Sequence, residues 1–160
     1  EQMNRQEVVA VLAHEIGHWR SRHVRQRLLF SAAVSAAGFY VAYGLVSFGD
    51  IPAWVGAGEL SLAAQLLVLS AAARIAGFFA TPLSAAWSRH HEREADDFAI
   101  RLTNQPRALA SALIKLAREN LANLYPHPLY AWFYYTHPPL VERVTRLQNL
   151  PSATPEEAQV

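Results

Sequence analysis

The chain has 160 residues, of which 52% are hydrophobic and 17% are Asp, Glu, Lys or Arg, whereas soluble domains average about 25% charged residues. This composition argues against a disordered chain and points towards a membrane. Fourteen Lys and Arg against thirteen Asp and Glu give a net charge of +1, too little to hold nucleic acid through its phosphates. Because the chain has no cysteine, disulfides, thiolate zinc ligands and a thiol nucleophile are excluded, and a metal site would have to use His and carboxylates.

The first predicted helix covers about residues 6–27, where apolar residues recur at three- and four-residue spacing without an internal proline. It carries the motif HEIGH. His14 and His18 are four positions apart and project from one face, where both imidazoles can bind one zinc ion. Glu15 lies beside them and suits a general base that acts on metal-activated water. On a continuous helix His23 turns away from the zinc, which predicts a packing or supporting role.

Two apolar stretches follow and are predicted to be transmembrane helices. Residues 28–48 contain no charge and are long enough to cross about 30 Å of hydrocarbon as a helix. The second span is predicted at about residues 60–87, with Arg74 as its single charge. Arg74 is costly there unless it faces a polar interior or pairs with a carboxylate upstream. The alternative for the two stretches is a buried helical hairpin inside a soluble protein.

The distribution of arginine predicts the orientation of the two spans. The linker of residues 49–59 contains no Lys or Arg. Arginines flank the other ends of the two spans, at Arg20, Arg22, Arg25, Arg27, Arg89 and Arg93. Positively charged flanks stay in the cytoplasm, so both chain ends are expected on the cytoplasmic side.

A helix at about residues 88–102 carries the second group of candidate ligands, in the segment SRHHEREADD. Glu92 can complete a site of two His and one carboxylate, which leaves a fourth position for water or substrate. Asp96 lies one turn further and can accept the second ring N–H of a ligating His. His91 is the strongest competitor as third ligand, because imidazole also suits zinc. Further alternatives in the segment are His90, Glu94 and Asp97.

The C-terminal part is predicted to hold two more helices, at about residues 106–123 and 138–149, separated by an aromatic stretch between prolines. Residues 151–160 are expected to form a flexible tail. The predicted fold class is therefore all-α, with membrane helices and juxtamembrane zinc-binding helices.

Four segments in this order, AVLAHEIGHWRSRH, SRHHEREADDFA, ALIKLARENL and YYTHPPLVERVTRL, resemble the type I CAAX prenyl proteases, which are integral-membrane zinc metalloproteases. The resemblance covers about Arg5 to Leu147. It implies that one Zn²⁺ binds His14, His18 and Glu92. It further implies catalytic roles for Glu15 as base, Asp96 as supporting or proton-donating group, and His137 and Arg143 as contacts to the substrate backbone. By spacing alone, His137 would be a turn histidine and Arg143 an ordinary exposed residue.

The resemblance also sets expectations for function. Residues 1–150 would be the catalytic region of a multi-pass membrane endopeptidase, in the bacterial inner membrane or the endoplasmic reticulum, with its active site towards the cytoplasm. Its partners would be the lipid bilayer and a peptide or protein substrate, including one with a C-terminal prenyl-cysteine, and not nucleic acid. Trp19 and His23 favour the prenyl protease branch, and related heat-shock membrane proteases are the enzymatic alternative.

Two further expectations concern the extent of the chain and a different class of function. The family has additional membrane helices and an edge strand that aligns substrate. An upstream part is therefore expected to be missing, and this piece alone is expected to be inactive. The non-enzymatic alternative is a membrane module in which zinc only clamps the juxtamembrane helices together.

Overall fold

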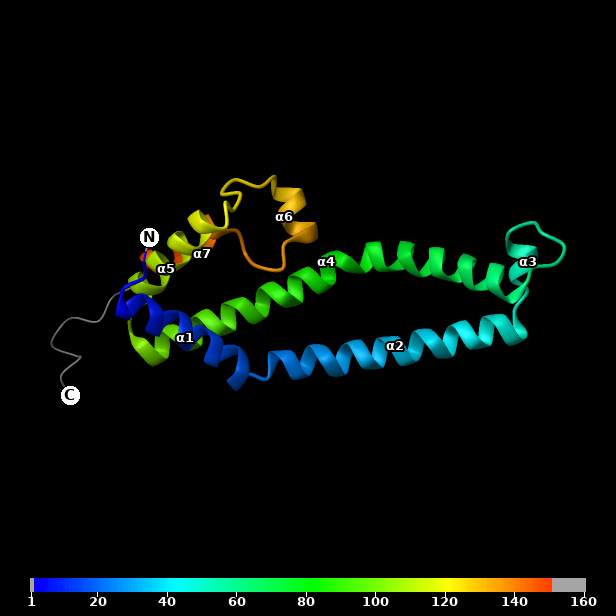
Figure 1. The fold of residues 1–160 in the computed structure, drawn as a ribbon, viewed down its shortest axis with the longest axis horizontal. Helices are drawn as coiled ribbons and strands as arrows, with labels where there is room; N and C mark the ends of the chain where they lie inside the picture. The colour runs from blue at the N-terminus through cyan, green and yellow to red at the C-terminus, as the bar shows by residue number, and fades with distance from the viewer. Residues whose placement is uncertain (1, 151–160) are drawn as a thin grey trace. The chain divides into compact units, whose positions relative to one another are not determined.

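A computed structural model describes residues 2–150, and within this range it contains helices and no strand. The all-α prediction is confirmed. The chain divides into two compact units, and Figure 1 shows the course of their helices. The hairpin unit is Val24–Thr81, and the site unit combines the residues up to His23 with those from Pro82 onwards. The predicted tail of residues 151–160 lies outside the described residues.

The first helix of the site unit, α1 (Arg5–Arg20), starts with a capping box. The Asn4 side chain accepts a hydrogen bond from the Glu7 N–H at 2.9 Å, and the Glu7 carboxylate accepts one from the Asn4 N–H at 2.7 Å. Two backbone donors that the helix leaves unpaired are satisfied in this way.

The single helix predicted for residues 6–27 is two helices in the structure, so that prediction was wrong. The N–H groups of Ser21 and Arg22 bond to the carbonyls of Gly17 and Trp19. Arg22 then adopts a left-handed conformation with φ of 57°, which ends an α-helix and redirects the chain. The next helix, α2 (His23–Phe48), begins immediately afterwards.

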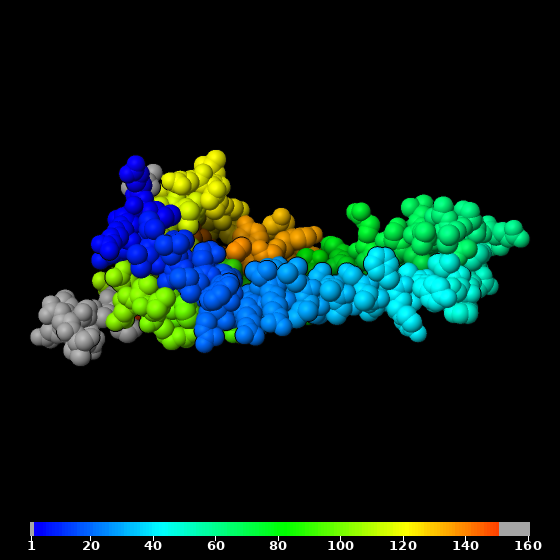
Figure 2. Space-filling view, turned by 60° about the horizontal axis from the view of Figure 1, so that its bottom comes forward, coloured from blue at the N-terminus to red at the C-terminus, as the bar shows by residue number. Residues whose placement is uncertain are grey.

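The hairpin unit consists of α2, the short α3 (Ile51–Trp54) and the first part of α4 (Leu62–Thr103). Helices α2 and α4 are long and apolar enough to cross a membrane, and none of their most apolar window is buried within the described structure. Figure 2 shows the light-blue side chains of α2 uncovered on the face in view. Within the described residues this window is therefore not packed into a core, as the soluble alternative would require. Arg74 is also exposed.

Helix α4 continues without a break from the second apolar stretch through the segment predicted to be helical at residues 88–102. Pro82 lies inside it. The candidate ligands predicted at residues 88–102 therefore lie on a helix and not in a loop.

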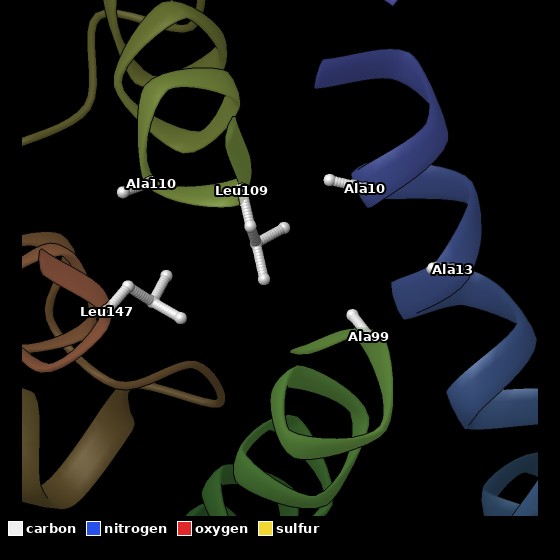
Figure 3. Packing of buried hydrophobic residues seen from close by; sticks show 6 residues of the cluster. All are labelled: Ala10, Ala13, Ala99, Leu109, Ala110 and Leu147. Atoms are coloured by element: carbon white, nitrogen blue, oxygen red, sulfur yellow. The ribbon is translucent and has the colours of Figure 1, made fainter. Parts of the chain in front are cut away.

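The core of the site unit lies where α1, α4, α5 (Pro106–Glu119) and α7 (Leu140–Gln148) meet (Figure 3). Its buried members are Ala10, Ala13, Ala99, Leu109, Ala110 and Leu147. Four of the six are alanines, which let helix backbones approach closely. Burial of each leucine contributes about 1.5–3 kcal/mol.

The C-terminal helices differ from prediction in two details. Helix α5 ends at Glu119 rather than near residue 123, because Asn120 caps it and Leu121 takes a positive φ of 49°. An additional helix, α6 (Pro128–Tyr134), forms within the aromatic stretch. The Arg89 guanidinium donates to the Tyr135 carbonyl at 2.7 Å, which ties the end of α6 to α4.

A buried ion pair joins α1 to α5. Glu7 is 2% exposed. Its carboxylate accepts hydrogen bonds from Lys115 Nζ at 2.9 Å and Ser111 Oγ at 2.6 Å. The bond from Lys115, together with those from Ser111 and the Asn4 N–H, lowers the pKa of Glu7 from 4.5 to about 2. The helix that carries HEIGH is thereby fixed to the C-terminal half of the site unit.

This depressed pKa predicts an acid-dependent loss of stability. A carboxyl whose pKa is lower in the folded state stabilises the fold above its unfolded pKa, and that stabilisation disappears as the pH falls through the folded value. The stability difference between the parent and Glu7→Gln should therefore be full above pH 4.5 and shrink towards pH 2. Thermal unfolding followed by circular dichroism in detergent measures it.

The matched control is Glu59→Gln, which alters an exposed carboxylate and should unfold like the parent at each pH. A gap between the parent and Glu7→Gln that stays constant from pH 6 to pH 2 would contradict the assigned ion pair.

Candidate metal centre

Three potential ligands converge between α1 and α4 within the site unit. His14 Nε2 lies 3.2 Å from His18 Nε2. Glu92 places Oε1 at 3.3 Å from His18 Nε2 and Oε2 at 3.7 Å from His14 Nε2. His14 and Glu92 are buried, and His18 is partly buried. We call these three residues the donor triangle.

The donor triangle has the chemistry and the spacing of a zinc site. A tetrahedral zinc ion with ligand distances of about 2.0–2.2 Å separates its donors by about 3.3–3.6 Å. The two imidazole nitrogens lie 3.2 Å apart, and the nearest contacts to Glu92 are 3.3 Å to Oε1 and 3.7 Å to Oε2. Burial lowers the pKa of His18, which favours the neutral imidazole that a metal requires. Two His and one carboxylate are the ligand set of catalytic sites that keep one position open.

Gly17 explains how α1 and α4 come close enough to form the donor triangle. A Cβ atom at this position would lie 3.0 Å from Ala95 Cα and 3.2 Å from the Ala95 carbonyl oxygen. Any larger residue would push the two backbones apart. The glycine of HEIGH is therefore needed for helix packing, between the two histidines that face Glu92.

Asp96 and Arg143 support the His14 imidazole. Asp96 Oδ1 lies 2.9 Å from His14 Nδ1. Arg143 on α7 holds the same carboxylate with two hydrogen bonds, from Nε at 3.0 Å and from an Nη at 2.6 Å. Burial raises the pKa of Asp96, but the hydrogen bonds from His14 and Arg143 and the guanidinium charge hold it below its usual value. Asp96 is thus an ionised acceptor that leaves Nε2 of His14 bare.

Glu92 is similarly surrounded by positive or donating groups. His137 Nδ1 lies 2.9 Å from Glu92 Oε2, and an Nη of Arg143 lies 3.3 Å from it. Burial raises the pKa of Glu92. The hydrogen bond with His137 and the charge of Arg143 lower this pKa by more than burial raises it, so the net shift is downward. The His137 side chain is 64% exposed, so it can also meet a ligand that arrives from solvent. Glu15 is exposed on α1, next to His14.

The competitor ligand His91 lies in a different group. His91 forms with His23 and Glu94 a second set of donor side chains, whereas the set that contains His14 and His18 takes its carboxylate from Glu92. His23 Nδ1 lies 2.9 Å from His18 Nδ1, so the break after α1 brings His23 back to the site instead of turning it away.

Sequence reasoning missed this contact because it rested on an uninterrupted helix. The segment 19–24, WRSRHV, contains neither Gly nor Pro, so no residue there marks the helix end. The four residues after Trp19, which are Arg20, Ser21, Arg22 and His23, are ordinary residues for the surface of a helix. The supporting role of His23 stays a prediction.

Residues 1–151 match the family described as Peptidase family M48. The chain belongs to this peptidase family. The CAAX prenyl protease 1 homolog of Mus musculus is 33% identical over 150 residues, covering 90% of this chain and 30% of the mouse protein. CAAX prenyl protease 1 of Saccharomyces cerevisiae is 33% identical over 156 residues, covering 88% of this chain and 34% of the yeast protein.

A solved structure and a bacterial relative extend the comparison. The crystal structure of S. mikatae Ste24p superposes with a TM-score of 0.71 at 29% identity, over 90% of this chain and 36% of that one. A Protease HtpX homolog from Ligilactobacillus salivarius is 29% identical over 171 residues, covering 94% of this chain and 56% of that protein. The resemblance inferred from the motifs is confirmed. The chain spans about a third of the length of the CAAX prenyl protease relatives.

The close approach at Gly17 gives a direct test of the helix crossing. Gly17→Ala should destabilise the site unit by about 1–3 kcal/mol, because the new methyl group meets backbone that cannot rotate away. Gly38→Ala, at a helical glycine of α2 with nothing within 4 Å of the added Cβ, is the matched control and should unfold like the parent. Equal unfolding temperatures for both variants would show that α1 and α4 do not touch at Gly17.

Proposed function

We propose that this chain is the catalytic region of a zinc-dependent membrane endopeptidase. His14, His18 and Glu92 would hold one Zn²⁺, which when bound polarises a scissile carbonyl and activates water. The spacing of the donor triangle is the observation that carries the proposal, because two imidazole nitrogens and the two oxygens of one carboxylate converge at 3.2–3.7 Å, close to the donor separations around a tetrahedral ion. Membership of Peptidase family M48 supports it.

Glu15 is proposed as the general base. It follows His14 on α1 and is exposed, so it lies beside the metal position without belonging to the donor triangle. A carboxylate there can take the proton of the attacking water and pass a proton to the leaving amine. The chain has no cysteine, and the proposed route needs no acyl-enzyme.

The remaining site residues are proposed to support this chemistry. Asp96, clamped by Arg143, fixes the tautomer and orientation of His14. His137 is exposed beside Glu92 and can donate a hydrogen bond to the oxygen that becomes negative in the transition state. The Arg143 guanidinium, 3.3 Å from Glu92, adds positive charge near the same oxygen.

The membrane setting is proposed from the two apolar helices and the arginine distribution. Helices α2 and α4 are each long and apolar enough to span a bilayer, and the arginines before the first span and after the second favour a cytoplasmic location for those two ends. The site residues follow directly on these ends. We therefore propose a multi-pass protein of the bacterial inner membrane or endoplasmic reticulum that cleaves its substrate at the cytoplasmic surface.

The substrate is proposed to be a peptide or protein, with a C-terminal prenyl-cysteine as the favoured class. The names of the mouse and yeast relatives support this class, as do Trp19 and His23. The second candidate is quality control of membrane proteins, favoured by the similarity to the bacterial Protease HtpX homolog, of which the chain covers the larger share. Cleavage assays on a prenylated peptide and on an unfolded membrane protein separate the two candidates.

The role of Glu15 predicts a variant that separates metal binding from hydrolysis. Glu15→Gln should bind zinc like the parent, because Glu15 is outside the donor triangle, while peptide hydrolysis falls by about 10²–10⁴-fold. Metal analysis and a cleavage assay measure both, on protein that includes the upstream part expected above and is purified from membranes in detergent. Cleavage at the parental rate in this variant would refute the assignment of the base.

The identity of the third ligand predicts a contrast between neighbouring residues. Glu92→Ala should lose zinc during dialysis against a chelator that leaves the parent loaded, because a first-coordination ligand is gone. His91→Ala should retain far more of its zinc, because His91 lies in the second donor group. If His91→Ala lost more zinc than Glu92→Ala, His91 would be the third ligand. If the parent and both variants retained equal amounts of zinc, the Glu92 carboxylate would not be a ligand.

A further inference from the structure

We propose that His23 is a positioning residue that fixes the tautomer of His18 and thereby keeps His18 Nε2 bare for the metal. The inference rests on the proposed zinc site. It assigns a task to His23, Glu94 and His91, which the proposed mechanism does not use. His23 is 2% exposed and His91 is 4% exposed, so both are part of the packed interior of the site unit.

The direction of each hydrogen bond follows from the one group that can only accept. Glu94 Oε2 lies 2.9 Å from His23 Nε2, and a carboxylate has no proton to donate, so His23 Nε2 carries the hydrogen. In neutral His23 the other nitrogen, Nδ1, is then an acceptor. It lies 2.9 Å from His18 Nδ1, so His18 donates from Nδ1.

These hydrogen bonds determine which nitrogen of His18 is free to bind a metal in the donor triangle. A neutral His18 that carries its hydrogen on Nδ1 has a lone pair on Nε2. That Nε2 is the atom 3.3 Å from Glu92 Oε1 and 3.2 Å from His14 Nε2. The series from Glu94 through His23 to His18 therefore selects the tautomer that can bind zinc.

In this proposal His14 and His18 would be oriented by different hydrogen-bond partners. His14 donates directly to Asp96, which Arg143 clamps. His18 has an imidazole between itself and its carboxylate. The left-handed Arg22 makes this possible, because it ends α1 and starts α2 with His23 folded back beside His18.

The geometry argues against the other use of these side chains, a second metal ion shared by His23, His91 and Glu94. The rings of His23 and His91 stack with centroids 4.0 Å apart and planes inclined by 8°. The lone pair of an imidazole lies in the ring plane, so an ion in the plane of one ring would lie a few ångströms out of the plane of the other. Both nitrogens of His23 also already have partners. The stack instead holds the His23 ring in place.

The test compares two nearly isosteric replacements. His23→Asn and His23→Leu both remove the stacking ring, but Asn keeps an acceptor oxygen close to the position of Nδ1 and Leu does not. Zinc affinity is measured by titrating the metal-free, detergent-purified protein against a competing chelator, and Co²⁺ absorption reports the ligand geometry. We expect His23→Leu to bind zinc about 10–100-fold more weakly than the parent, and His23→Asn to recover most of that loss with a parental Co²⁺ spectrum.

A second pair of variants covers the case in which His23→Leu fails to fold. The Glu94 side chain is 46% exposed, so Glu94→Ala should fold, and its zinc affinity should lie between those of the parent and His23→Leu. Asp97→Ala, which removes a carboxylate of the same helix whose partner is Arg146, should bind zinc like the parent.

The outcomes separate this inference from the proposed function. A parent that binds no zinc refutes both. A parent that binds one zinc ion, with His23→Leu and Glu94→Ala equally tight, overturns the positioning role alone. If His23→Asn bound zinc as weakly as His23→Leu, the loss of affinity would come from the lost ring packing, and the positioning role would again be overturned. A second zinc equivalent in the parent that disappears in His23→Leu would show that the stacked pair is itself a metal site.

Discussion

The site depends on the convergence of three electron-rich atoms at one helix crossing. Two imidazole nitrogens of α1 and a carboxylate oxygen of α4 lie 3.2 and 3.3 Å apart. Bare donors at such separations repel one another unless a proton or a cation lies among them. The surrounding structure is arranged to hold them there: Gly17 allows the backbones to touch, alanines line the crossing behind it, and Glu7 anchors α1 to α5 through Lys115.

Each residue of the donor triangle has its own neighbouring groups. His14 faces an ionised Asp96, and Glu92 is met by His137 and Arg143. Arg143 on α7 contacts the carboxylates of both Asp96 and Glu92, so this helix is part of the site although none of its residues belongs to the donor triangle. In the proposed arrangement His18 is oriented through His23. Outer groups of this kind commonly determine whether a histidine presents the nitrogen that the metal needs.

The sequence predicted the parts of this site that depend on local geometry. The spacing of His14 and His18, and of Glu92 and Asp96, places each pair on one helical face wherever the segment is helical. The all-α fold followed from the long apolar stretches and the absence of a strand pattern. The motif resemblance contributed His137 and Arg143, which spacing alone would have left as a turn histidine and a surface arginine.

The rest depended on backbone events that the sequence does not mark. The left-handed turn at Arg22 uses a residue with no special preference for that conformation, so neither the helix end nor the return of His23 was foreseeable. The same holds for Leu121, which shortens α5.

The central claim is most directly tested by anomalous diffraction at the zinc edge from crystals of the protein grown with its native metal. The account predicts one anomalous peak about 2.0–2.2 Å from His14 Nε2, His18 Nε2 and a Glu92 oxygen, with no fourth protein ligand. A peak bound elsewhere, a fourth ligand such as His91 or His137, or crystals of active protein without zinc would contradict it.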